Sequence, residues 1–129
     1  MRALPALCVL AVALSPLLLV AGCRGGRETP PAQIVPDGSP GAGARVIASY
    51  RCGACHTIPG IKGADGLVGP PLTLFARRTY VGGELPNTPA NLVRWIRDPP
   101  AVEPGTAMPA LGLSEQQARD AAAYLYTLR

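Results

Sequence analysis

The chain has 129 residues and a formal net charge of +4, from 12 Lys and Arg against 8 Asp and Glu. Its first two dozen residues have the composition of a targeting segment, which leaves roughly 105 residues, enough for one domain. The charges are not clustered, which argues against a nucleic-acid-binding protein, because such proteins gather Lys and Arg on one face. About 90 residues remain beyond a Pro- and Gly-rich stretch, and domains of that size usually depend on a disulfide, a metal or a cofactor.

The N-terminus is typical of an exported protein. A positive start, Met1 and Arg2, is followed by an apolar run from Ala3 to Gly22. The run ends in the residues 19–23, Leu-Val-Ala-Gly-Cys, which resemble the lipobox of bacterial lipoproteins. The resemblance implies that residues 1–22 are a signal peptide and that Cys23 becomes a lipidated N-terminus, held at a membrane by its acyl chains.

Two alternatives to the lipid anchor stay open. The apolar run is long enough to be a retained transmembrane anchor, and simple cleavage would release a soluble protein. All three interpretations place the rest of the chain on the periplasmic or extracytoplasmic side of the membrane. Residues 23–40 contain four prolines and no apolar periodicity, so we expect a lipidated Cys followed by a tether.

The remaining residues, 41–129, are predicted to form one domain. Residues 43–51 favour a short helix, because Val46, Ile47 and Tyr50 fall on one face. Residues 57–71 are so rich in Gly and Pro that they predict a loop. Residues 72–80 could form one or two helical turns, and Gly82 and Gly83 interrupt the chain again.

The C-terminal half predicts two more helices. Thr88 is a candidate N-cap with Pro89 at the first helical position, and Pro99 and Pro100 stop this helix. A second loop spans residues 99–109. Ser114 with Gln117 forms a capping box for a terminal helix. We therefore expect an all-α domain of three main helices, with no strand signal and with two loops long enough to wrap a cofactor.

The cofactor is indicated by residues 52–56, Cys-Gly-Ala-Cys-His, the Cys-x-x-Cys-His signature of covalent haem attachment. On a helical turn, both thiols lie on one side and can bond haem vinyl groups, while His56 binds the iron. A disulfide or a thioredoxin-like dithiol at Cys52 and Cys55 is disfavoured because no βαβ pattern surrounds them. A zinc site is disfavoured because, beyond Cys52, Cys55 and His56, residues 41–129 contain no further Cys or His as a fourth ligand.

The sixth iron ligand is predicted from the small number of histidines and methionines in the chain. His56 is the only histidine, so bis-histidine ligation within one chain is excluded. Met108 is the only methionine beyond the initiator, and a thioether is a soft ligand that suits haem iron. Lys62 or water are the alternatives.

The stretch 43–129 resembles class I cytochromes c, most closely the haem domains linked to subunit II of haem-copper oxidases. Beyond the haem motif, the resemblance rests on residues 69–72 (Gly-Pro-Pro-Leu), 87–96 with Trp95, 104–109 (Pro-Gly-Thr-Ala-Met-Pro) and 123–125 (Ala-Tyr-Leu). It implies the small cytochrome c fold, with three main helices and long Pro/Gly-rich loops wrapped around one covalent haem c.

The resemblance also implies roles for single residues. The Pro70 carbonyl would accept the second imidazole proton of His56, and Leu72 would pack on the haem. Arg78, together with Asn87 and Trp95, would meet the haem propionates, although Arg77 and Arg78 could equally form a solvated face.

The terminal helices of this family cross closely, which the resemblance assigns to Gly43 packing against Tyr124 and Leu125. Ala48 stands where many members carry an aromatic residue, so Ile47 or Tyr50 would supply that contact here.

An iron closed by His56 and Met108 has no open position for a substrate, so we expect outer-sphere one-electron transfer rather than an enzyme. We expect docking at the haem edge near Cys55, rimmed by Ile58, Pro59 and Pro109. Transient partners would be a quinol-cytochrome c reductase or a dehydrogenase on one side and a terminal oxidase on the other. The alternatives are a gas- or peroxide-binding haem, if Met108 does not bind, and a fixed subunit of a larger complex.

Overall fold

The computed structural model describes residues 33–129. Its elements, in chain order, are α1 (Pro40–Ser49), the 3-10 turns η1 (Cys52–Ala54) and η2 (Phe75–Arg77), the strands β1 (Tyr80–Val81) and β2 (Leu85–Pro86), and the helices α2 (Pro89–Arg97), α3 (Pro99–Val102) and α4 (Glu115–Leu125). The predicted signal peptide and the lipidation of Cys23 fall on residues outside this range. Within residues 33–129, none of the helices has the length and apolar character needed to span a membrane.

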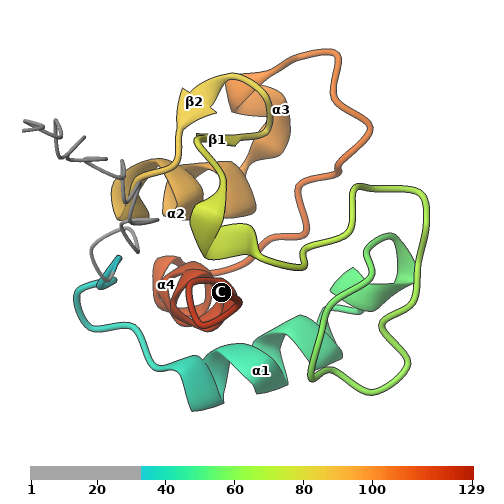
Figure 1. The fold of residues 1–129 in the computed structure, drawn as a ribbon. Helices are drawn as coiled ribbons and strands as arrows, with labels where there is room; N and C mark the ends of the chain where they lie inside the picture. Colours follow the sequence, from blue (N-terminus) through green and yellow to red (C-terminus); the bar gives the residue numbers. More distant parts are fainter. Residues whose placement is uncertain (1–32) are drawn as a thin grey trace, which may run out of the picture.

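The first and last helices cross at a glycine, as predicted. Figure 1 shows α4 end-on, with α1 on one side and α2 on the other. A Cβ built on Gly43 would lie 2.6 Å from the Asp120 carbonyl carbon and 2.9 Å from the Tyr124 Cβ, so only glycine permits this approach. Ile47, one turn further along α1, is buried, and the Tyr50 hydroxyl donates a hydrogen bond to Gln117 Oε1 at 3.0 Å.

Local capping defines the other two main helices. The Thr88 hydroxyl accepts a hydrogen bond from the Asn91 N–H at 3.3 Å, with Pro89 at the first helical position. The Ser114 hydroxyl accepts from the Gln117 N–H, and the Gln117 side chain accepts from the Ser114 N–H, which confirms the predicted capping box. These contacts lie within four residues of each other and could therefore be predicted from sequence.

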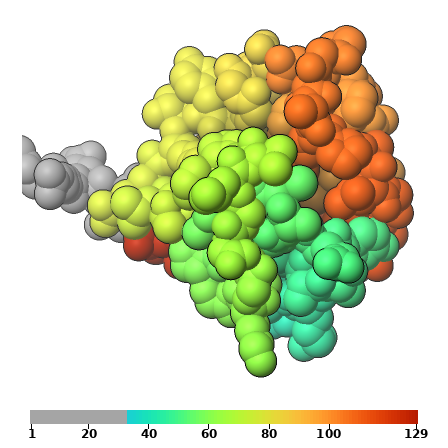
Figure 2. Space-filling model, turned by 90° about the vertical axis from the view of Figure 1, so that its right-hand side faces the viewer, coloured from blue at the N-terminus to red at the C-terminus, as the bar shows by residue number. Residues whose placement is uncertain are grey.

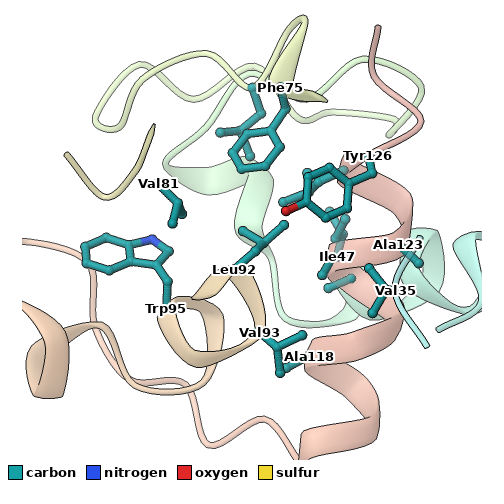
Figure 3. Packing of buried hydrophobic residues seen from close by; sticks show 14 of the residues in the cluster. Val35, Ile47, Phe75, Val81, Leu92, Val93, Trp95, Ala118, Ala123 and Tyr126 are labelled. Carbon is teal, nitrogen blue, oxygen red and sulfur yellow. The ribbon is translucent and has the colours of Figure 1, made fainter. Parts of the chain in front are cut away.

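The apolar faces of the three helices meet in one core (Figure 3). Leu92 of α2 lies at its centre, fully buried, and Phe75 and Tyr126 pack with ring centroids 6.1 Å apart. The remaining buried members come from every part of the described chain, among them Val35, Ile47, Val81, Trp95, Ala118 and Ala122. Burial of this surface supplies the main drive for folding.

Four sequence predictions need correction. The first helix is Pro40–Ser49 rather than residues 43–51, because Ser39 caps it and Arg51 adopts a left-handed conformation with φ of 55°. Residues 99–102 form the short helix α3, capped by the Asp98 carboxylate, rather than the start of a loop. Residues 72–80 contain one 3-10 turn, in agreement with the one or two helical turns predicted there, but residues 80–86 form a two-stranded antiparallel hairpin that the sequence did not indicate.

The fourth correction concerns the end of the expected tether, because residues 33–39 pack against the domain, whereas residues 23–32 of that tether lie outside the described range. Val35 is 5% exposed. The Ser39 N–H donates a hydrogen bond to Asp120 Oδ1 at 2.8 Å, and the Gln116 side chain donates to the Asp37 carbonyl at 2.8 Å. The folded part of the chain therefore includes residues 33–40 as well as 41–129. We call residues 33–39 the N-terminal strap.

Candidate functional site

The Cys-x-x-Cys-His segment folds into a tight turn directly after α1. The left-handed Arg51 reverses the chain, and the N–H groups of Cys55 and His56 both donate to the Cys52 carbonyl, at 3.2 and 3.0 Å. Gly53 lies against Ala64, where a Cβ would approach to 2.5 Å. The turn therefore holds the cysteines and the histidine in one fixed group.

His56 is oriented by the loop that follows. Its Nδ1 lies 2.8 Å from the Pro70 carbonyl oxygen, as the family resemblance implied. A carbonyl can only accept, so Nδ1 carries the proton and Nε2 is left with its lone pair for a metal. A Cβ on Gly69 would overlap the imidazole ring, lying 2.6 Å from Nδ1. Gly69 and Pro70 thus fix the ring orientation and the tautomer together.

A two-part cavity opens beside this turn. Its outer chamber has a volume of about 470 Å³ and its inner chamber about 90 Å³. Cys52, His56 and Met108 line both chambers, together with Gly82, Trp95 and Leu111. The outer chamber is also lined by Tyr50, Arg51, Ala54, Cys55, Val68, Gly69, Pro70, Thr106, Ala107 and Pro109. The structure therefore brings together the two cysteines and the histidine of one segment with the methionine of another.

The face that bears this cavity is built from two loops distant in sequence. Figure 2 shows this side of the molecule. The segment after the Cys52–His56 motif, in green, and the loop that contains Met108, in orange, are both on the face toward the viewer. The Met108 N–H donates to the Thr106 hydroxyl at 3.2 Å, which shapes the loop locally.

The cavity is apolar, with one cation in each chamber. Arg51 is the only Asp, Glu, Lys or Arg among the residues that line the outer chamber, and Arg78 is the only one lining the inner chamber. Partial burial lowers the pKa of Arg78 by desolvation, and its guanidinium lies over the Phe75 ring, 5.3 Å from the centroid. The same guanidinium donates a hydrogen bond to the Pro71 carbonyl. Such a lining suits a large flat ligand that is mostly apolar and carries a few anionic groups.

The donor set fits haem c. Cys52 and Cys55 are both free thiols in this structure. Burial raises the pKa of the Cys52 thiol, with a further contribution from neighbouring Cys55. Among residues 33–129, no three His, Cys, Asp or Glu side chains gather as they would around zinc. Two thiols, an imidazole with a free nitrogen and a thioether around one apolar cavity are the set that a covalently attached haem uses.

Of the other residues that the resemblance assigns to the site, all but one line the cavity. Leu72 and Arg78 line the inner chamber, Pro70 lines the outer chamber, and Trp95 lines both. Asn87 lines neither. Its side-chain nitrogen donates to the carbonyls of Phe75 and Arg78, and its side-chain oxygen accepts from the Tyr126 hydroxyl. Every polar atom of this side chain already has a partner within the protein, which does not favour a contact of Asn87 with a propionate; that contact stays a prediction.

The expected docking rim also changes. Cys55, Pro59 and Pro109 are exposed, whereas Ile58 is only 2% exposed and lines the inner chamber. Ile58 therefore belongs to the interior of the site. Val68 and Leu111 take part in the outer wall instead and are exposed.

Phe75 and Gly82 are among the residues of the site that sequence reasoning missed. Phe75 lies at the inner chamber under Arg78. Gly82 has φ of 63°, and a Cβ there would lie 2.6 Å from the Trp95 ring, so this glycine makes room for the indole. Gly82 could be recognised from sequence as a chain interruption, but its contact with Trp95 requires the fold.

Comparison with known proteins agrees with this geometry. Residues 41–129 match the family model of cytochrome c, and the chain therefore belongs to the cytochrome c family. Members of this family carry a covalently bound haem c that serves in electron transfer. The small all-α cytochrome c fold is the one expected from the sequence, apart from the two short strands β1 and β2.

Two curated relatives, both named as subunits of cytochrome c oxidase, are similar in sequence to this chain. The chain is 36% identical over 88 residues to cytochrome c oxidase subunit 2 of Alkalihalophilus pseudofirmus, covering 67% of this chain and 25% of that protein. It is 32% identical over 87 residues to the subunit 2 of a Bacillus species, covering 64% of this chain and 24% of that protein. The chain thus spans about a quarter of the length of the curated relatives it matches.

Two solved structures share the fold. The SoxXA structure from P. pantotrophus superposes with a TM-score of 0.57 at 25% identity, covering 70% of this chain and 82% of that chain. Cytochrome c2 from Paracoccus denitrificans gives a TM-score of 0.51 at 22% identity, covering 70% of this chain and 95% of that one. The second likeness bears on the fold alone.

Proposed function

We propose that this chain is a lipid-anchored one-electron carrier that holds one haem c through Cys52 and Cys55, with His56 and Met108 as the axial ligands of the iron. One observation supports the ligand pair most directly. His56 has its Nδ1 bound to Pro70 and its Nε2 free, while the thioether of Met108 lines the same two chambers.

The haem supplies reversible one-electron chemistry at its iron, and the chain's residues tune and protect it. Pro70 holds the imidazole proton at Nδ1, which raises the basicity of the other nitrogen as a ligand. The apolar side chains of Leu72, Trp95 and Ile58 exclude water from the inner chamber. Two protein ligands leave no open position, which favours electron transfer over substrate chemistry.

The curated relatives and the predicted signal peptide support the partners and the location that we propose. The two curated relatives are subunits of cytochrome c oxidase, which supports a terminal oxidase as the electron acceptor in a respiratory chain. A quinol-cytochrome c reductase or a dehydrogenase would supply the electrons. The residues 19–23, Leu-Val-Ala-Gly-Cys, support acylation of Cys23 and a place on the outer side of the cytoplasmic membrane.

The test is a visible spectrum of the full chain purified from a host that attaches haem c. The reduced protein should show the spectrum of a six-coordinate haem c, at one haem per chain, and added carbon monoxide should leave it unchanged. A carbon monoxide adduct formed at once would contradict the proposed electron carrier and would favour a gas- or peroxide-binding haem. Mass spectrometry of the same sample tests the anchor, since the N-terminal peptide should begin at Cys23 and carry acyl chains.

A further inference from the structure

Tyr126 lies outside the site but is connected to it. It is 3% exposed, follows directly after α4, and lines neither chamber. Its ring packs against Phe75, and its hydroxyl donates to Asn87 Oδ1 at 2.9 Å (Figure 3 shows the two rings). Burial raises the pKa of this phenol to about 12, so the hydroxyl remains a donor at any physiological pH.

Asn87 connects Tyr126 to one short turn of the chain, η2. Its side-chain nitrogen donates to the Phe75 carbonyl at 3.3 Å and to the Arg78 carbonyl at 3.0 Å, which are the first residue of η2 and the residue that ends it. Its backbone is held too, because the Asn87 N–H donates to the Thr79 carbonyl at 2.8 Å. An amide donates only two hydrogens, and both are used on this turn.

The turn carries Arg78 into the cavity wall. The guanidinium lies over the Phe75 ring and donates to the Pro71 carbonyl. The neighbouring carbonyl, that of Pro70, is the one that accepts the imidazole proton of His56. One end of this network is therefore the C-terminus of α4, and the other end is the iron-binding side of the site.

We propose that Tyr126 is a positioning residue for the haem site, acting through Asn87 to hold Arg78 at the inner chamber and beside the Pro70–Pro71 carbonyls. The inference rests on a haem bound in these chambers, as proposed above. A cation fixed near a haem favours reduction, which adds one negative charge. Loss of the Tyr126 hydroxyl should leave the Asn87 amide free to turn, loosen Arg78 and lower the reduction potential.

The experiment is a double-mutant cycle on the full-length holoprotein. Tyr126→Phe keeps the ring and removes the hydroxyl, and Arg78→Gln removes the cation. Each change alone should lower the reduction potential, and Tyr126→Phe should cause no further shift in the Arg78→Gln background, because both act through the same cation. A normal six-coordinate haem c spectrum of the unmodified protein is required first, and its absence would count against the proposed function instead.

A second tyrosine on the same helix end provides a matched control. The Tyr124 hydroxyl donates to the Pro59 carbonyl at 2.7 Å. Tyr124 lines neither chamber, and this hydrogen bond does not reach the Phe75–Arg78 turn. Tyr124→Phe should therefore lower the melting temperature without lowering the potential.

The proposal is overturned if Tyr126→Phe lowers only the melting temperature, or if its potential shift is the same with and without Arg78. Should Tyr126→Phe not accumulate as holoprotein, Asn87→Ser is measured in the same cycle, because serine keeps one donor but is too short to hold both carbonyls. The absence of coupling to Arg78 in that variant would overturn the proposal equally.

Discussion

At the scale of single residues, the site depends on two side chains whose surroundings leave them few options. His56 has one nitrogen bound to Pro70 and a glycine against its ring. Arg78 has its guanidinium between an aromatic ring and a carbonyl at the cavity wall. In both cases a backbone carbonyl from residues 69–71 fixes the position of the side chain. This short segment therefore orients both His56 and Arg78.

Gly69 is the residue whose replacement tests this arrangement most simply. Gly69→Ala should place a methyl group into the His56 ring, displace the imidazole from Pro70 and destabilise the holoprotein by about 1–3 kcal/mol. The measurement is thermal or denaturant unfolding of the haem-loaded protein. Gly105→Ala is the control, since a Cβ there meets nothing within 4 Å. Equal stability of the two variants would contradict the proposed packing.

How far the site could be predicted depends on how local each contact is. The Cys-x-x-Cys-His spacing indicates a haem ligand set because the residues are adjacent in sequence, and His56 and Pro70 were linked by the family resemblance. The role of Asn87 could not be predicted in this way. Its partners Phe75 and Tyr126 lie 12 and 39 residues away, and no local pattern in the sequence indicates which groups meet an amide across such distances.

At the scale of elements, the three main helices combine strong local signals with one close crossing. The caps at Thr88 and Ser114 were predictable, because a capping side chain lies within three residues of the N–H it accepts from. The helix α3 was missed because two adjacent prolines were interpreted as a loop, although prolines fit the first turn of a helix when Asp98 caps it. The hairpin of β1 and β2 was missed because each strand has only two residues.

The crossing of α1 and α4 can be tested within one helix. Gly43→Ala should force the two helices apart and cost about 1–3 kcal/mol of unfolding free energy, because the added methyl group meets the Asp120 backbone. Gly41→Ala lies two residues earlier in α1 and meets nothing within 4 Å. It should leave stability unchanged or raise it by about 0.5–1 kcal/mol through the higher helix propensity of alanine. A comparable loss in both variants would mean that the crossing tolerates a side chain.

At the scale of the whole molecule, the folded unit begins before the region that matches the family. The family match covers residues 41–129, whereas the N-terminal strap contacts α4 at several points. The Gln33 side chain also donates to the Asn87 carbonyl at 3.0 Å. Composition predicted a tether here, because prolines and polar residues carry no signal for packing against a helix some 80 residues further along the chain.

A pair of adjacent strap residues shows whether this packing contributes to stability. Val35→Ala should cost about 1–2 kcal/mol of unfolding free energy, because Val35 is buried against the core. Ile34→Ala is the control, since Ile34 is 75% exposed, and its effect should stay within about 0.5 kcal/mol. Chemical denaturation of the full chain measures both. If Val35→Ala were as neutral as Ile34→Ala, the strap would not be part of the cooperative unit.

The most direct test of the central claim is the absorption spectrum of Met108→Ala. We expect the oxidised variant to lose the far-red band of methionine-bound ferric haem, and we expect the reduced variant to bind carbon monoxide at once, while the thioether bonds to Cys52 and Cys55 keep the haem attached. An oxidised spectrum identical to that of the unmodified protein, together with no binding of carbon monoxide, would show that Met108 is not the sixth ligand.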